Sequence, residues 1–144
     1  MEALPILVVE DDDLVRSFLC RALTGLAGDV QACATGADAL RAVDGHHFGA
    51  ILLDGLLPDI HGLELAKKLV AHPHATTSGI CFVSGSLRYP VAMRDGVSAL
   101  PKPLRLRELL DAVGHLLSWS HGGGSTTLAR LDALNILSAG LLVS

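Results

Sequence analysis

Cysteines, basic residues and long uncharged apolar runs are all scarce in this chain of 144 residues. The cysteines, Cys20, Cys33 and Cys81, are widely spaced, with no CxxC pair and no neighbouring histidine at metal-ligand distance. The sequence therefore does not predict a cysteine-based metal site, and we expect the three thiols to be small buried apolar groups. The histidines of segments 46–47 and 72–74 fall in polar breaks between apolar stretches, which favours solvated loop residues.

The small number of basic residues limits the kinds of partner. Eleven lysines and arginines are scattered along the sequence, and the formal net charge is -4. Contacts to a phosphate backbone need clustered basic side chains, so we expect no direct binding of nucleic acid. The chain also lacks a signal-peptide pattern at its N-terminus and an uncharged stretch long enough to span a bilayer. These absences predict a cytoplasmic protein with no membrane association.

The composition and length are typical of one folded domain. Half of the residues are apolar and 18% are charged, which favours a globular chain over a disordered one. Because the composition changes after Trp119, we expect a domain over residues 1–119, a Gly/Ser-rich linker over 120–127 and an apolar tail over 128–144. Leucine spacing in the tail favours a helix, but residues 136–143 are equally compatible with a strand or an unstructured end.

Two kinds of apolar segment alternate along the chain. Continuous runs, typical of strands buried on both faces of a parallel sheet, occur at 4–9, 48–53 and 80–83, with weaker strand patterns at 30–34 and 97–100. Helical spacing is found at 14–23, 37–43, 63–70 and 104–117. This alternation predicts an α/β fold of (βα)5 type, with a doubly wound, five-stranded parallel sheet and helices on both faces.

Polar residues stand where four of the predicted strands end. The first strand runs into the acidic segment 10–13, the third into Asp54, the fourth into Ser84 and the fifth into Lys102. The carboxyl ends of parallel strands meet at one edge of the sheet, so we expect these side chains to share one crevice.

Such a crevice would hold several carboxylates, which repel one another unless a hard divalent cation neutralises them. Mg²⁺ fits best, because it takes oxygen ligands and keeps water-filled positions that a phosphate can occupy. A carboxylate can also attack phosphorus to form an aspartyl phosphate, and Lys102 would neutralise charge on the phosphoryl oxygens. Taken alone, Asp54 would more simply cap a loop or helix, and helix capping is the expectation for Asp12 or Asp13.

Four segments, ILVVEDD, LLDGLLPDIHG, VSG and KP, resemble in this order the signature segments of bacterial response-regulator receiver domains. The resemblance covers residues 4–118 and implies a flavodoxin-like fold with sheet order 2-1-3-4-5. It also implies that Asp54 accepts a phosphoryl group, that Ser84 bonds this group and that Lys102 forms an ion pair with it. The implied Mg²⁺ ligands are Glu10, Asp11, Asp54 and the backbone carbonyl of Leu56.

The chain departs from the family between Ser84 and Lys102. This segment is shorter than is typical, and Tyr89 and Pro90 stand where the fourth helix would begin, so we expect that helix to be shortened or irregular. The family usually carries a switch tyrosine or phenylalanine three residues before the lysine, where this chain has Ala99. Tyr89, the only tyrosine, either takes that place in space or is a partly exposed loop aromatic.

The resemblance implies a stand-alone phosphoacceptor in a two-component phosphorelay. It would take a phosphoryl group from a sensor histidine kinase or a phosphotransfer protein and signal to a downstream protein target. We expect no enzyme activity beyond Mg²⁺-dependent self-phosphorylation and autodephosphorylation. A homodimer through the face of the fourth helix, fifth strand and fifth helix, or through the tail, is a further expectation.

Two other function classes compete with this one. A pseudo-receiver would keep the fold as a protein-interaction module without being phosphorylated; Ala99 favours it, whereas the complete set of acids, hydroxyl and lysine disfavours it. A phosphoaspartate hydrolase of another α/β family would usually have a second aspartate two residues after the first. That position is Leu56 here, which disfavours the hydrolase.

Overall fold

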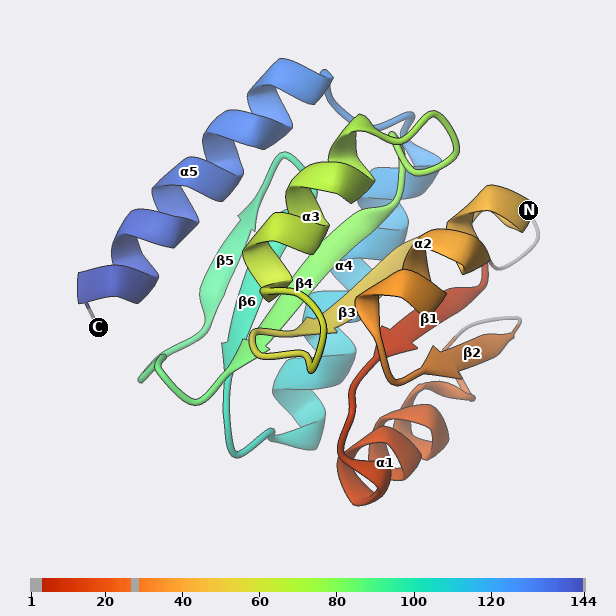
Figure 1. The fold of residues 1–144 in the computed structure, drawn as a ribbon, viewed down its shortest axis with the longest axis vertical. Helices are drawn as coiled ribbons and strands as arrows, with labels where there is room; N and C mark the ends of the chain where they lie inside the picture. The colour runs from red at the N-terminus through yellow and green to blue at the C-terminus, as the bar shows by residue number, and fades with distance from the viewer. Residues whose placement is uncertain (1–3, 27–28, 144) are drawn as a thin grey trace.

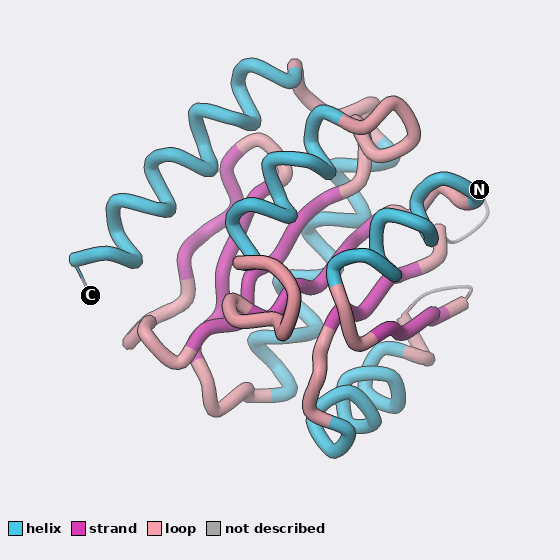
Figure 2. Tube along the Cα trace, viewed as in Figure 1, coloured by secondary structure: helices cyan, strands magenta, loops and turns pink. Residues whose placement is uncertain are grey.

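The structure, a computed structural model, describes residues 4–26 and 29–143. Its centre is one six-stranded sheet in the order β2-β1-β3-β4-β6-β5, with helices on both faces (Figures 1 and 2). The strands are β1 (Ile6–Val9), β2 (Val30–Cys33), β3 (Ala50–Asp54), β4 (Gly79–Ser84), β5 (Val91–Arg94) and β6 (Val97–Pro101). The helices are α1 (Asp13–Leu23), α2 (Gly36–Gly45), α3 (Gly62–Ala71), α4 (Leu106–His121) and α5 (Thr127–Val143).

The predicted α/β fold is confirmed by the five parallel strands. β1 pairs in parallel with β2 and β3, β3 pairs with β4, and β4 pairs with β6. The predicted order 2-1-3-4-5 therefore corresponds to β2-β1-β3-β4-β6. The carboxyl ends of these strands lie at one edge of the sheet, as a doubly wound fold requires.

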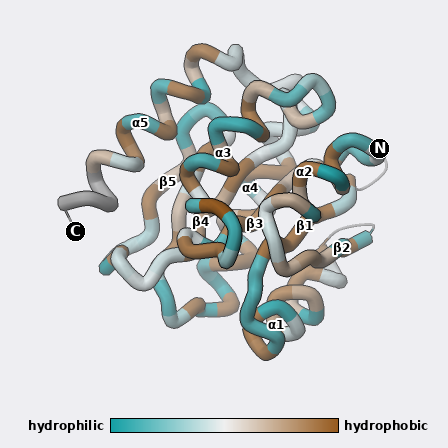
Figure 3. Tube along the Cα trace, viewed as in Figure 1, coloured by the Kyte–Doolittle hydropathy of each residue, from teal (hydrophilic) through white to brown (hydrophobic). Residues whose placement is uncertain are grey.

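The continuous apolar runs form strands because both faces of the sheet are covered. Every residue of β1 is buried, and its side chains alternate between two core clusters on opposite sides. Leu7 and Val9 join the cluster under α2, α3 and α5, whereas Ile6 and Val8 join the cluster under α1 and α4. Figure 3 shows how hydrophobic residues gather in these central strands.

The predicted shortened or irregular fourth helix does not form. All residues between β4 and β6 are described, and the chain returns at the edge of the sheet as β5, antiparallel to β6. Asp95 and Gly96 join the two strands with φ angles of 51° and 73°, the backbone that Asp-Gly adopts in a tight hairpin. Gly96 is also required because a Cβ there would lie 2.6 Å from the Trp119 ring.

The C-terminal segment covers the part of the sheet that a fourth helix would have covered. The sequence placed a domain boundary at residue 119, but α4 continues to His121 and α5 packs beside α3 (Figure 1). Ala133, Leu134 and Leu137 of α5 belong to the same core cluster as Phe82 of β4. Residues 1–3 and 27–28 of the predicted domain, and residue 144 of the predicted tail, lie outside the described residues.

Arg130 fixes the N-terminal half of α5 to its surroundings. Its side chain is fully buried, and the guanidinium lies 4.5 Å from the centre of the Trp119 ring. The same group donates hydrogen bonds to five backbone carbonyls, those of Ala75, Thr76, Ser78, Asp95 and Gly96. Burial lowers the pKa of Arg130 from its usual value to about 10, partly offset by the charge of Asp95. One side chain therefore joins α5, α4, the loop before β4 and the β5–β6 turn.

Within residues 4–26 and 29–143, no helix has the length and apolar character needed to cross a membrane.

Candidate functional site

Three carboxylates from two neighbouring strand ends form one cluster. Glu10 and Asp11 follow β1, and Asp54 is the last residue of β3. Each offers an oxygen that lies within 4.8 Å of the others, and Glu10 is almost fully buried. Because β1 and β3 are adjacent and parallel, their carboxyl ends bring these side chains together as the sequence predicts.

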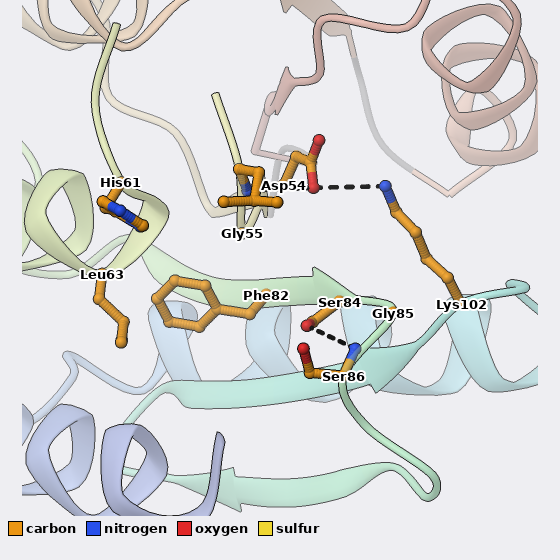
Figure 4. A pocket seen from close by; sticks show the side chains of 10 residues that line it. Asp54, Gly55, His61, Leu63, Phe82, Ser84, Gly85, Ser86 and Lys102 are labelled. Atoms are coloured by element: carbon orange, nitrogen blue, oxygen red, sulfur yellow. Dashed lines mark hydrogen bonds and ion pairs between the residues drawn. The ribbon is translucent and has the colours of Figure 1, made fainter. Parts of the chain in front are cut away.

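Lys102 completes the charged cluster from the end of β6. Its backbone N–H donates to the carbonyl of Ser84 at 3.0 Å, which fixes the chain at this edge. Its Nζ lies 3.3 Å from Asp54 Oδ1 and 3.3 Å from Glu10 Oε1 (Figure 4 shows the bond to Asp54). The Lys102–Pro103 peptide bond is cis.

The cluster has more negative than positive charge, and its pKa values reflect this. Burial, together with the neighbouring Asp54 carboxylate, raises the pKa of Glu10 to about 7, although Lys102 pulls it downward. Burial alone would lower the pKa of Lys102, but Asp54 and Glu10 outweigh this effect and raise it. Glu10 Oε2 is buried and has no hydrogen-bond partner among the described residues. An oxygen-rich, anionic cluster with an unpartnered buried oxygen suits a hard divalent cation.

Asp54 faces a cavity of about 400 Å³ (Figure 4). Ser84, at the end of β4, and Lys102 line the same cavity, together with His61. The Ser84 hydroxyl oxygen accepts a hydrogen bond of 3.1 Å from the backbone N–H of Ser86. The structure thus brings Glu10, Asp11, Asp54, Ser84 and Lys102 to one end of the sheet.

The loop after β3 closes one side of this cavity. Leu56 lines the cavity, and its backbone N–H donates to Asp54 Oδ1 at 3.4 Å. Leu56 also forms an isolated antiparallel bridge with His61. The loop passes so close to α3 that a Cβ on Gly62 would lie 2.6 Å from the Asp54 carbonyl oxygen, so only glycine fits there. His61 has no counterpart among the roles that the sequence suggested.

Asp12 and Asp13 stay outside the carboxylate cluster, as expected. Asp12 Oδ1 accepts a hydrogen bond of 2.9 Å from Val15 N, which confirms that Asp12 caps α1. Asp13 forms an ion pair with Arg16.

Two contacts near the site were missed by the sequence reasoning. Arg16 lies in the predicted helix 14–23 without a suggested role, and its Nη1 donates to the carbonyl of Glu10 at 2.9 Å. Asp59, in the β3–α3 loop, accepts hydrogen bonds from the backbone N–H groups of Gly36 and Ala37 at the start of α2. These bonds lower the pKa of Asp59. Both contacts join residues of different loops or elements, and no local sequence signal marks them.

The aromatic side chain missing at Ala99 is not supplied by Tyr89. Ala99 is fully buried in β6, opposite Phe82 of β4 and Val91 of β5. Tyr89 precedes β5 and is 77% exposed, so it is a loop aromatic and does not occupy the place beside Ala99.

The cysteines and most histidines lie apart from the carboxylate cluster. Cys81 is buried as predicted, whereas Cys20 and Cys33 are half-buried. Burial raises the pKa of Cys81 to about 12 and that of Cys33 to about 11, so these thiols are protonated at neutral pH. Within the described part of the chain, the histidines of segments 46–47 and 72–74 form no cluster of three metal-binding side chains.

Comparison with known proteins gives a consistent family match. A profile of the response regulator receiver domain matches residues 6–114. The transcriptional regulatory protein TcrA of Mycobacterium tuberculosis is 37% identical over 106 residues, which cover 72% of this chain and 42% of TcrA. The chain thus spans less than half the length of that relative.

Solved structures agree with this match. The CheY-like response regulator receiver domain protein of Methanospirillum hungatei has a TM-score of 0.70 and 26% identity, and the alignment covers 85% of this chain and 100% of that chain. The receiver domain of sensor histidine kinase PA1611 from Pseudomonas aeruginosa, solved with a magnesium ion in its active-site cleft, has a TM-score of 0.68 and 23% identity. It covers 81% of this chain and 98% of its own.

Proposed function

Because the chain belongs to the response regulator receiver domain family, we propose that it is a phosphoacceptor of a two-component phosphorelay and that Asp54 is the residue phosphorylated. The observation that carries the proposal is the position of the Lys102 ammonium, 3.3 Å from both Asp54 Oδ1 and Glu10 Oε1. A structural module would have no use for three carboxylates and one lysine around an open cavity.

In the proposed step, an oxygen of the Asp54 carboxylate attacks the phosphorus of a phosphohistidine on the donor protein. An O–P bond forms, the P–N bond breaks, and its electron pair stays on the donor imidazole nitrogen. Lys102 neutralises charge on the phosphoryl oxygens, and the hydroxyl of Ser84 donates a hydrogen bond to one of them. The product is an aspartyl phosphate at the end of β3.

We further propose that the carboxylate cluster holds Mg²⁺. Glu10, Asp11, Asp54 and the Leu56 carbonyl are the proposed ligands, and the unpartnered Oε2 of Glu10 supports this assignment. When bound, Mg²⁺ would neutralise the carboxylates and the phosphoryl oxygens. The receiver domain of PA1611, a structural neighbour, holds a magnesium ion in its active-site cleft, which supports a magnesium site in this chain.

The phosphoryl group would later be lost to water, whose oxygen attacks the phosphorus while the Asp54–phosphate bond breaks. Asp54 returns to a carboxylate, the product is inorganic phosphate, and the proton of the water goes to phosphate or solvent. The protein would therefore cycle by self-phosphorylation and autodephosphorylation, without turning over a substrate as an enzyme does.

A shallow apolar surface beside Lys102 is the proposed docking site for the phosphodonor protein. It is lined by Leu14, Val15 and Phe18 of α1 together with Lys102 to Leu104. Leu14 is 84% exposed, although it stands within a few residues of the acidic cluster. An apolar surface bordering the cavity would position a donor side chain for transfer to Asp54.

The output of the protein is proposed to be contact with another protein. TcrA is named a transcriptional regulatory protein, but this chain matches only 42% of its length, so that activity is not transferred to this chain. The expectations of a stand-alone receiver, of a homodimer, of a cytoplasmic location and of no direct nucleic-acid binding stay predictions.

Phosphorylation of the full chain with a small phosphodonor tests the proposal. With Mg²⁺ and acetyl phosphate, intact mass measurement should find one added phosphoryl group, which chelation of Mg²⁺ should prevent. Asp54→Asn should abolish the adduct, whereas the matched control Asp111→Asn, at an exposed position of α4, should retain it. A folded wild-type protein that never forms the adduct would favour the pseudo-receiver, and steady release of phosphate with fast turnover would favour the hydrolase.

A further inference from the structure

A second cavity lies away from the carboxylate cluster, between α5 and β5 with its preceding loop. Its volume is about 620 Å³, and most of its lining is apolar. The floor is formed by Leu87, Val91, Val97, Ala133, Ile136 and Leu137. We call this cavity the β5–α5 groove.

Large apolar side chains are exposed around the β5–α5 groove. Tyr89 is 77% exposed, Ile136 is 55% exposed, and Val91 of β5 is also exposed. Single exposed apolar residues are common on protein surfaces, but several around one hollow indicate a binding surface.

Two arginines give the β5–α5 groove a positive charge in a protein whose net charge is -4. Arg88 and Arg94 both line it and are exposed, and none of the lining residues is acidic. Neither arginine forms an ion pair within the described part of the chain, whereas Arg16 and Arg41 each pair with an aspartate. The complementary ligand is therefore anionic as well as apolar.

A second copy of this chain is a poor match for the groove. β5 is the outermost strand, so its free edge could in principle pair with β5 of another copy. However, the β5–β6 pairing is irregular between Val91 and Arg94, and Arg94 itself is charged and exposed. A bulge and a charged residue on an edge strand oppose such pairing.

We propose that the β5–α5 groove binds an acidic segment of a partner protein that carries at least two large apolar side chains. The apolar side chains pack on Val91 and Ile136, and flanking carboxylates pair with Arg88 and Arg94. Residues 87–90, which line the groove, follow directly after Gly85 and Ser86, which line the Asp54 cavity. The lining of the groove thus indicates the chemistry of the signalling partner. The biological role of the groove rests on the proposed phosphoacceptor function.

The probe for this proposal is a synthetic peptide with leucine and phenylalanine at helical spacing, flanked by glutamates. It is titrated into the isotope-labelled full chain and followed by backbone amide NMR. We expect shift changes to concentrate at Val91–Arg94 and around Ile136. Peptides with lysine in place of glutamate, or with serine in place of the apolar residues, should bind at least about tenfold more weakly.

Substitutions in the groove should give matching losses. Ile136→Asp should abolish binding because it places a carboxylate on the apolar floor, and it should leave the fold intact because Ile136 is more than half exposed. Arg88→Glu combined with Arg94→Glu should weaken binding at least about tenfold, whereas Arg21→Glu, an exposed arginine of α1, should not change it. Circular dichroism checks that each variant is folded.

Three results would overturn the proposal: equal binding of the lysine peptide, shift changes confined to another surface, or no binding by a folded wild-type protein. Self-association of the chain through the groove, detected by sedimentation without peptide, would likewise replace the proposed partner with a second copy. The unphosphorylated protein and Asp54→Asn should bind the peptide equally. Failure of phosphorylation and failure of peptide binding are therefore distinguishable.

Discussion

Replacing Arg130 by methionine should destabilise the domain by about 3 kcal/mol at neutral pH. The substitution keeps a long apolar side chain but removes all five hydrogen bonds from the guanidinium to backbone carbonyls. It also removes the contact with the Trp119 ring. Among the described residues, no carboxylate forms a direct ion pair with Arg130. The buried guanidinium is therefore held by backbone carbonyls and not by a buried salt bridge.

The magnitude follows from two opposing contributions. Each of the five lost hydrogen bonds costs about 1 kcal/mol, and the lost ring contact costs about 1 kcal/mol. Against this, burial lowers the pKa of Arg130 to about 10, well below its usual value. Because each pKa unit corresponds to about 1.4 kcal/mol, removing the buried charge returns about 3 kcal/mol. The burial penalty is present in full at pH values below about 10 and fades only as the pH rises from there toward the usual pKa of arginine.

Urea unfolding, followed by far-UV circular dichroism and by fluorescence of the single tryptophan, measures this change. Trp119 lies directly against Arg130, so its fluorescence reports the attachment of α5. Arg130→Lys should recover only part of the stability, because an ammonium has three donors. The exposed Arg21→Met is the control and should stay within about 0.5 kcal/mol of wild type. An Arg130→Met protein as stable as this control would refute the reasoning.

The remaining predictions concern the Asp54 site. An NMR titration of the Glu10 carboxyl should give a pKa near 7. Asp54→Asn should lower this pKa because it removes a negative charge, and Lys102→Met should raise it because it removes a positive charge. Shifts of the Glu10 pKa in the opposite directions would contradict the geometry. Because the Glu10 pKa is raised from 4.5, the stability of the metal-free protein should fall as the pH rises from 4.5 through about 7. Mg²⁺ should raise the urea midpoint more above this pH range than below it. An equal increase of the midpoint on both sides of the range would count against the proposed metal site. Leu14→Glu should slow phosphoryl transfer from a phosphohistidine protein about tenfold and leave the rate of phosphorylation by acetyl phosphate unchanged. Leu128→Glu, at another exposed leucine, should change neither rate. Equal slowing with both donors would argue against docking at Leu14.

The parallel sheet and the meeting of the strand ends could be predicted from the sequence because both depend on local patterns. Buried apolar runs mark β1, β3 and β4, and an acid or hydroxyl stands at the end of each. Once the strands are parallel, the positions of Asp54, Ser84 and Lys102 at one edge follow from chain direction alone. The helix cap by Asp12 is equally local.

The edge strand and the last helix were harder to predict because long-range contacts decide them. Asp95-Gly96 is a hairpin signal, but residues 91–94 are exposed and lack the apolar pattern of a buried strand. From the sequence alone, an arginine such as Arg130 is expected to be solvated. Only its neighbours in the folded chain provide the carbonyls that accept its hydrogen bonds and allow its burial. The tail was separated from the domain for the same reason, because its contacts are with α3 and β6.

The position of α5 changes where a truncation of this protein can safely be made. The family profile ends at residue 114, whereas Ala133, Leu134 and Leu137 fill the core against strands from the matched region. A fragment cut to the matched residues would keep every residue proposed to act on phosphate, yet it would leave Phe82, Val97 and Ala99 uncovered on one side of the sheet. The smallest expressible unit is therefore set by the helix that covers these strands, and extends well past the residues that identify the family.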